Sequence, residues 1–131
     1  MSTDESIRLK LEADAESVGV ARRAVAELAE GFGMTEPALG DVKTIVTEAC
    51  ANVVQHAYPL GPGQFEVEAA RLHGRLSIVV RDFGVGMRAR IEGGEPSLRL
   101  GLGLISMLAD NFAISGGNPG TEIRMQLALT S

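Results

Sequence analysis

The chain has 131 residues, 45% of them hydrophobic and 22% charged, and a formal net charge of −5. A chain of this length is typical of one domain with a real core, and its composition excludes a disordered protein. The acidic balance argues against direct binding to nucleic acid, because no basic run could neutralise a phosphate backbone. The charged start argues against a signal peptide, and the longest aliphatic run is too short to span a bilayer. We therefore expect a cytoplasmic protein that does not contact a membrane.

Hydrophobic patterning predicts elements in the order β α α β β α β β. Five segments carry alternating or β-branched apolar residues and are predicted as strands: residues 6–13, 65–69, 76–81, 112–115 and 121–129. Three segments repeat apolar residues at helical spacing: residues 14–33, with Asp14 as N-cap and Gly31 and Gly33 at the end, residues 41–58, and the segment 100–110, which two glycines open before the helix itself. This order indicates an α/β (α+β) two-layer sandwich, with a mostly antiparallel sheet and helices on one face.

The helix over 41–58 is expected to begin after Pro37 and Gly40 and to stop at Pro59, because proline and glycine disfavour helix interiors. Its apolar residues fall on one broad stripe: Val42, Ile45, Val46, Ala49, Cys50, Val53 and Ala57. This stripe predicts a face buried in the core. The single cysteine lies on it and is interpreted as a small core residue, and one cysteine excludes an internal disulfide.

Three polar residues of the same helix, Glu48, Asn52 and His56, follow one another at i, i+4 and i+8. They therefore form a row along one edge of the apolar stripe. A carboxylate, an amide and an imidazole could line a site, but a core helix can also carry such a row as a polar rim. His56 is more often a packed or capping residue than a catalyst, and His73 is predicted as a turn residue. Neither histidine indicates a metal site.

The segment DFGVGM follows the strand over 76–81. Asp82 can stay anchored at the strand end while Gly84 and Gly86 let the backbone bend sharply or approach a ligand closely. An ordinary turn that begins with aspartate explains the same residues.

The segment RLGLGL places Gly101 and Gly103 directly before a predicted helix. Unpaired backbone N–H groups and the helix dipole favour anions at such a place, and Arg99 adds a positive charge suited to phosphate. Tight packing of a loop against a helix is the alternative explanation for the two glycines. Near the end of the chain, a hairpin turn explains Gly120-Thr121 without any functional role.

Taken in order, E-x-x-x-N, D-x-G-x-G, G-x-G and G-T resemble the N, G1, G2 and G3 boxes of the GHKL ATPase superfamily. Within it, TEACANVVQHAYP is similar to the anti-sigma factor serine kinases of bacteria. The resemblance implies a single histidine-kinase-like ATPase domain over residues 1–131 with a Bergerat-type ATP-binding fold. No dimerisation helix or phosphoacceptor histidine domain precedes it, which would distinguish the chain from a complete sensor histidine kinase.

The resemblance also implies a role for each motif residue. Glu48 would take the proton from an attacking serine hydroxyl, and the amide oxygen of Asn52 would bind Mg²⁺. Asp82 would accept a hydrogen bond from the adenine amino group. Gly84 and Gly86 would let the adenine base lie close to the backbone, and Thr121 would add a hydrogen bond near Asp82. Arg99, Gly101 and Gly103 would bind the phosphates, and the segment 88–100 would act as a lid.

The function implied by the resemblance is an ATP-dependent serine protein kinase that acts as an anti-sigma factor. Such a kinase binds a sigma factor and phosphorylates a serine on a STAS-domain anti-anti-sigma partner, and homodimers are common in the family. Two alternatives stay open. One is an ATP-binding regulatory module without kinase activity, against which Glu48 argues because a pure binder needs no base. The other is a switch kinase that phosphorylates a stressosome-like scaffold, against which His56-Ala57-Tyr58 argues modestly.

Overall fold

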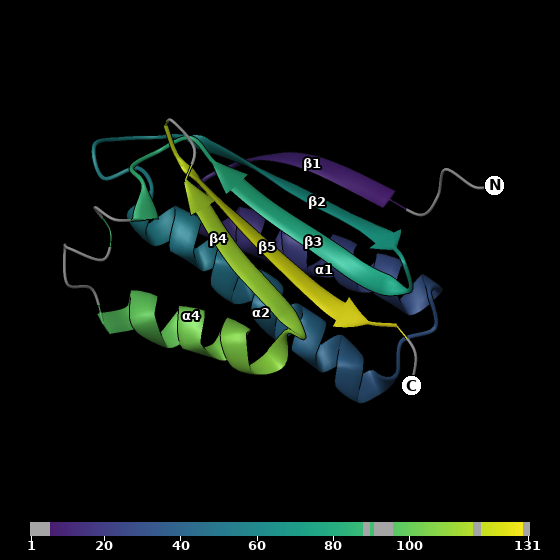
Figure 1. Ribbon diagram of the computed structural model, residues 1–131. Coiled ribbons are helices and arrows are strands. Elements are labelled where there is room, and N and C mark those ends of the chain that lie inside the picture. The colour runs from purple at the N-terminus through teal and green to yellow at the C-terminus, as the bar shows by residue number, and fades with distance from the viewer. Residues whose placement is uncertain (1–5, 88–89, 91–95, 117–118, 130–131) are drawn as a thin grey trace.

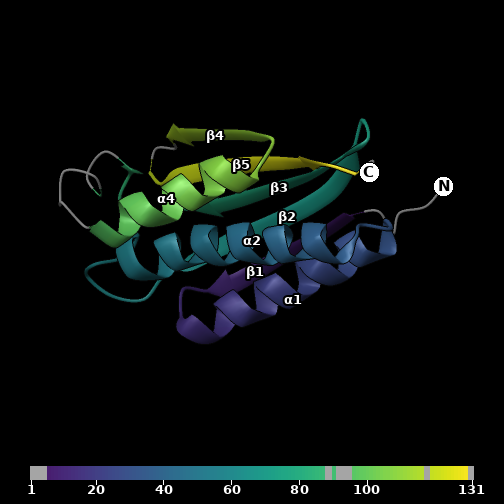
Figure 2. The same ribbon diagram turned by 90° about the horizontal axis from the view of Figure 1, so that it is seen from below.

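The structure is a computed structural model of the chain and describes residues 6–87, 90, 96–116 and 119–129. Its described part is a five-stranded sheet with three helices on one face (Figures 1 and 2). The strands are β1 (Ser6–Glu12), β2 (Gln64–Leu72), β3 (Arg75–Asp82), β4 (Asn111–Gly116) and β5 (Thr121–Ala128). The helices are α1 (Ala15–Gly31), α2 (Glu36–His56) and α4 (Pro96–Leu108).

The strands lie in the order β1-β2-β3-β5-β4, and each pairs antiparallel with its neighbours. The central strand β3 therefore ends between β2 and β5, where Asp82 lies opposite Phe65 on one side and Thr121 on the other. The predicted two-layer α+β sandwich is confirmed. The register places one carboxylate at the end of the most protected strand.

The core lies between the sheet and α2, which runs between α1 and α4 (Figure 2). Every second residue of the three inner strands points into it: Phe65, Val67, Ala69, Leu76, Ile78, Val80, Ile123, Met125 and Leu127. The apolar stripe of α2 covers these residues, as its spacing predicts, and Cys50 is fully buried there. The edge of α2 that carries the polar row is thereby turned towards α4.

The helix-free face of the sheet carries a network of charges centred on Arg81. Its guanidinium donates to Glu66 at 2.9 Å, Glu68 at 3.2 Å and Glu122 at 2.9 Å. Burial alone would lower the pKa of Arg81, but the hydrogen bonds that it donates to these three carboxylates raise that pKa above its usual value. Cross-strand pairs of this kind stabilise the register of β2, β3 and β5.

The predicted start of the second helix is wrong, because α2 begins at Glu36 and not after Gly40. Thr35 is its N-cap, and the hydroxyl of Thr35 accepts a hydrogen bond from the amide of Ala38. Pro37 lies in the first turn of α2, where a missing N–H costs nothing. This proline is therefore part of the helix and does not precede it. The helix ends at His56, just before the predicted end at Tyr58.

The predicted position of the third helix is also wrong. Helix α4 begins at Pro96, so Gly101 and Gly103 lie inside it and not in a loop before it. Their amides are beyond the first four residues of the helix and bond within it, so they offer no free N–H groups in this state. Gly101 is buried against α2, where a Cβ atom would lie 2.7 Å from Oε1 of Glu48. Tight packing, the alternative explanation for the glycines, therefore holds for Gly101.

The two glycines of α4 make a matched pair for testing this packing. We expect Gly103→Ala to raise the free energy of unfolding by about 0.5–1 kcal/mol, because alanine is the better helix former and no atom lies within 4 Å of its added Cβ. Gly101→Ala should gain less or lose stability, because its methyl group displaces Glu48. Urea denaturation of both variants measures the difference, and equal gains would contradict the close contact between α4 and α2.

The buried thiol of Cys50 predicts a pH dependence of stability. Burial raises its pKa from 9.0 to about 12. The unfolded chain loses this proton above about pH 9 while the folded chain keeps it, so stability that is fully present below pH 9 falls as the pH rises.

We expect wild type to lose about 1–2 kcal/mol more than Cys50→Ala between pH 8 and pH 10.5 in denaturant unfolding, from a limiting slope of about 1.4 kcal/mol per pH unit. Cys50→Ala is the control because it lacks the thiol but keeps every other titrating group. Parallel pH profiles for the two proteins would show that the thiol ionises freely in the folded state.

Candidate functional site

A cavity of about 150 Å³ lies between α2 and α4. It is lined by the complete polar row of α2 together with neighbouring residues: Glu48, Ala51, Asn52, Gln55, His56, Gly101 and Leu102. The row follows from helical spacing, and the apolar stripe beside it fixes its direction by packing on the sheet. The predicted row and the first glycine of the G-x-G segment therefore meet at one cavity.

Asn52 is the most informative residue of this cavity. Its side chain is only 6% exposed, and neither its amide oxygen nor its amide nitrogen has a hydrogen-bond partner within the described residues. The buried Nε2 atom of His56 is likewise unpartnered there. Buried polar groups in folded proteins are nearly always paired, because an unpaired group costs about 1–3 kcal/mol. Two such groups at one cavity indicate a place built for a polar ligand.

A second cluster lies at the end of β3. Asp82 is 2% exposed, and its Oδ1 accepts a hydrogen bond from the amide of Gly84 at 3.1 Å. Thr121, opposite Asp82 in the register, is also 2% exposed, and its hydroxyl oxygen has no partner among the residues described. The segment that ends β3 therefore presents a buried carboxylate beside an unpaired buried hydroxyl.

Gly84 connects this second cluster to the end of α2. The amide of Val85 donates to the carbonyl of Ala57 at 2.8 Å, and a Cβ atom on Gly84 would overlap that same carbonyl. Only glycine permits this approach. The hydroxyl of Tyr58 adds a second link, because it accepts from the amide of Phe83 at 2.9 Å and donates to the carbonyl of Gln64.

Arg90 is a site residue that the sequence did not identify, because 88–100 was interpreted as a lid. Its Nη2 atom lies 2.7 Å from both carboxylate oxygens of Asp82, and its Nε atom donates to the carbonyl of Val85 at 2.9 Å. No periodicity links an arginine to an aspartate eight residues earlier, and only the fold brings them together. Of the predicted lid over 88–100, residues 88–89 and 91–95 lie outside the described residues. Its last part, residues 96–100, forms the start of α4.

The other predicted site residues are less closely placed. Gly86 lies near the start of β5, where a Cβ atom would be 3.8 Å from the carbonyl of Gly120. Gly103 is exposed on α4 and does not line the cavity between the helices. The backbone of Arg99 belongs to α4, and its side chain is outside the described part of the structure.

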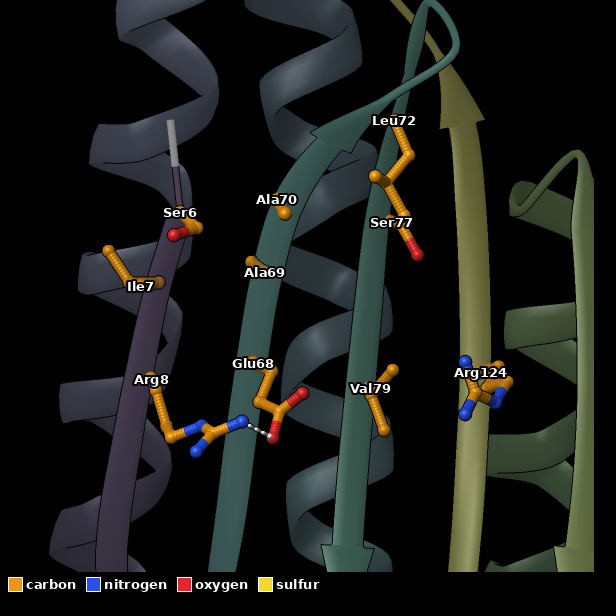
Figure 3. Close-up of a pocket in the computed structure, with 10 residues that line it drawn as sticks. All are labelled: Ser6, Ile7, Arg8, Glu68, Ala69, Ala70, Leu72, Ser77, Val79 and Arg124. Atoms are coloured by element: carbon orange, nitrogen blue, oxygen red, sulfur yellow. Dashed lines mark ion pairs between the residues drawn. The ribbon is translucent and has the colours of Figure 1, made fainter. Parts of the chain in front are cut away.

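Three larger hollows lack these features, and one of them, of about 210 Å³, lies between α1 and the start of α2 without lining by any of the unpartnered atoms found in the described residues. The other two are larger still. One, of about 360 Å³, lies on the helix-free face of the sheet, where Arg8 and Glu68 form an ion pair at 3.1 Å (Figure 3). The other, of about 370 Å³, lies beside Tyr58 and Gly84 at the end of α2. In the described part of the chain, neither is lined by a buried polar atom that lacks a partner. The unpaired atoms therefore favour the smaller cavity as the site.

A comparison with protein families matches residues 11–127 to the model of the histidine kinase-like ATPase domain. The chain belongs to this family. Among characterised members, it is 32% identical over 127 residues to the serine-protein kinase RsbW of Bacillus cereus, covering 87% of this chain and 79% of the relative. RsbW of Bacillus thuringiensis matches with the same identity and coverage. The family membership expected from the four boxes is confirmed.

Solved structures show the same ATPase-domain fold. The RsbU and RsbW domains of a Mycobacterium tuberculosis protein match with a TM-score of 0.74 and 21% identity, over 94% of this chain and 32% of that one. A blue-light activated histidine kinase of Erythrobacter litoralis matches with a TM-score of 0.60 and 20% identity, over 87% of this chain and 60% of that one. This chain thus spans about a third of the first structure's length. Across the residues described, no helix combines the length and apolar character required to cross a membrane.

The unpaired amide of Asn52 predicts that the site weakens the fold. We expect Asn52→Leu to raise the free energy of unfolding by about 1–3 kcal/mol, because it removes two buried polar atoms that lack partners in the part of the chain that the structure describes. Asn52→Asp is the control of equal size, and it should destabilise because it buries a charge. Denaturant unfolding without added ligand measures both, and a loss of stability in Asn52→Leu would show that the amide is satisfied.

Proposed function

We propose that this protein is an ATP-dependent serine protein kinase of the anti-sigma factor type, acting on a serine of an anti-anti-sigma partner. The observation that carries the proposal is the buried amide of Asn52, which has no partner among the described residues, in a cavity that it shares with Glu48. In a histidine kinase-like ATPase domain similar to serine-protein kinase RsbW, this is the pairing that phosphoryl transfer to a hydroxyl requires.

The adenine base of ATP is assigned to the end of β3. The Asp82 carboxylate can accept from the exocyclic amino group, and the unpaired hydroxyl of Thr121 supplies a second hydrogen bond beside it. Gly84 brings the backbone close at this point. Burial strengthens both hydrogen bonds because little water competes for them.

The phosphates and Mg²⁺ are assigned to the cavity between α2 and α4. The amide oxygen of Asn52 is a hard ligand suited to Mg²⁺, and the bound ion would neutralise charge on the phosphates. Glu48, one turn earlier on α2, would hold the proton released by the serine hydroxyl as that hydroxyl attacks.

Helix α4 must change for Gly101 and Gly103 to bind phosphate through their amides, because those amides bond within the helix in this state. The cost is moderated by the glycines themselves, each of which weakens a helix by about 1 kcal/mol relative to alanine. Unwinding of the first turns would free these amides, bring Arg99 towards the same anion and uncover Glu48.

The partners proposed are a sigma factor, held inactive by the kinase, and a STAS-domain anti-anti-sigma protein as the phosphate acceptor. Both belong in the cytoplasm, and a homodimer of a single 1–131 ATPase domain is the form we propose. A second candidate function is a nucleotide-gated binding module without transfer. The close approach of Gly101 to Glu48 favours this second function, because α4 restricts access to the proposed general base in this state.

Phosphate transfer distinguishes the two candidates. We expect Glu48→Gln to bind ATP with unchanged affinity but to phosphorylate a purified STAS-domain partner at least about a hundredfold more slowly, because the general base is lost. Glu36→Gln, an exposed change in the first turn of the same helix, is the matched control. Labelled phosphate on serine is the readout. Wild-type binding of ATP without any transfer would favour the binding module.

A further inference from the structure

The ion pair between Asp82 and Arg90 is the most completely buried charge contact in the described structure. The side chains are 2% and 0% exposed, and Nη2 of Arg90 lies 2.7 Å from each carboxylate oxygen. The network of Arg81, by contrast, lies on the open face of the sheet, with its side chain 28% exposed. A pair that excludes water this fully holds both side chains in one position.

Arg90 leaves little of the Asp82 carboxylate for another donor. Oδ1 accepts from both the Gly84 amide and Arg90, and Oδ2 accepts from Arg90. An adenine amino group is a planar N–H donor, as a guanidinium is, and it would need the same carboxylate edge. The two donors therefore compete for one acceptor in a space closed to water.

The hydrogen bonding of Arg90 is incomplete in this position. Its Nε atom and backbone amide donate to the carbonyls of Val85 and Gly86, but its buried Nη1 atom has no partner among the described residues. Thr121, beside Asp82, likewise keeps an unpaired hydroxyl while Arg90 is in place. A static structural ion pair would be expected to satisfy these donors.

We infer that Arg90 is an intramolecular competitor of the nucleotide base: it neutralises Asp82 in the free protein and must leave before adenine binds. This inference rests on the proposed ATP site. A buried carboxylate without any partner would be costly, so Arg90 protects the empty fold. The same contact raises the apparent dissociation constant of ATP by the factor by which the paired state is favoured.

Arg90→Gln tests this competition, because glutamine can still donate one hydrogen bond to Asp82 but carries no charge. We expect it to bind ATP about tenfold more tightly than wild type in calorimetric titrations with Mg²⁺. The free protein should also have a lower Tm. Arg81→Gln is the matched control, since it removes an arginine that binds three carboxylates on the helix-free face of the sheet, opposite to the face that carries the site, and its ATP affinity should stay unchanged.

Adenosine and inorganic tripolyphosphate show which part of ATP competes with Arg90. The gain in affinity should appear with adenosine and be absent with inorganic tripolyphosphate, because Arg90 competes with the base and not with the phosphates. Equal or weaker binding of ATP by Arg90→Gln, in a protein that still unfolds cooperatively, would overturn the inference and make Arg90 a structural residue or a direct ligand. A gain with tripolyphosphate would likewise overturn it.

Asp82→Asn separates failure of this inference from failure of the proposed function. If wild type binds ATP and Asp82→Asn weakens it while Arg90→Gln does not tighten it, only the competition is wrong. If neither wild type nor Arg90→Gln binds ATP or adenosine, the proposed ATP site is wrong and the inference fails with it. If Arg90→Gln binds ATP that wild type does not, competition by Arg90 is confirmed in its strongest form.

Discussion

Burial of one face of α2 against the sheet is the constraint on which the rest of this structure depends. The stripe from Val42 to Ala57 packs on the three inner strands, while α1 and α4 flank it. This packing leaves the helix no freedom to rotate, so the edge that carries Glu48, Asn52 and His56 must face α4. An apolar interaction thereby fixes the direction of the polar groups that line the candidate site.

The two halves of the candidate site meet because the end of α2 also holds the end of β3. The contact of Gly84 and Val85 with Ala57 joins them through backbone atoms, and Tyr58 binds the same segment through its hydroxyl. The Asp82 cluster is thus positioned relative to Asn52 by one rigid element. For a kinase that must align a base and a chain of phosphates, such a shared support limits misalignment.

In the free protein, some polar groups of the candidate site have hydrogen-bond partners and others do not. Asp82 is neutralised by Arg90, whereas Asn52, His56 and Thr121 keep polar atoms without partners within the described residues. Helix α4 packs closely against Glu48, which is half-buried, at the same time. In the proposed ATP site, nucleotide would displace this arrangement at two places, the end of β3 and the start of α4. Stability given up at unpaired groups is a common consequence of building a binding site.

The sequence by itself determined the order of elements, the antiparallel two-layer fold, the buried stripe of α2, the polar row and the family. These depend on periodicity and short motifs, which are local. Pro37 and the glycines of α4 misled the prediction of helix bounds, because the same residues are tolerated in a first turn or at a close helix contact. Only the tertiary structure decided that Gly101 packs on Glu48 and that Arg90 pairs with Asp82. Both contacts join separate segments and form only when the folded chain brings those segments together, which no local pattern records.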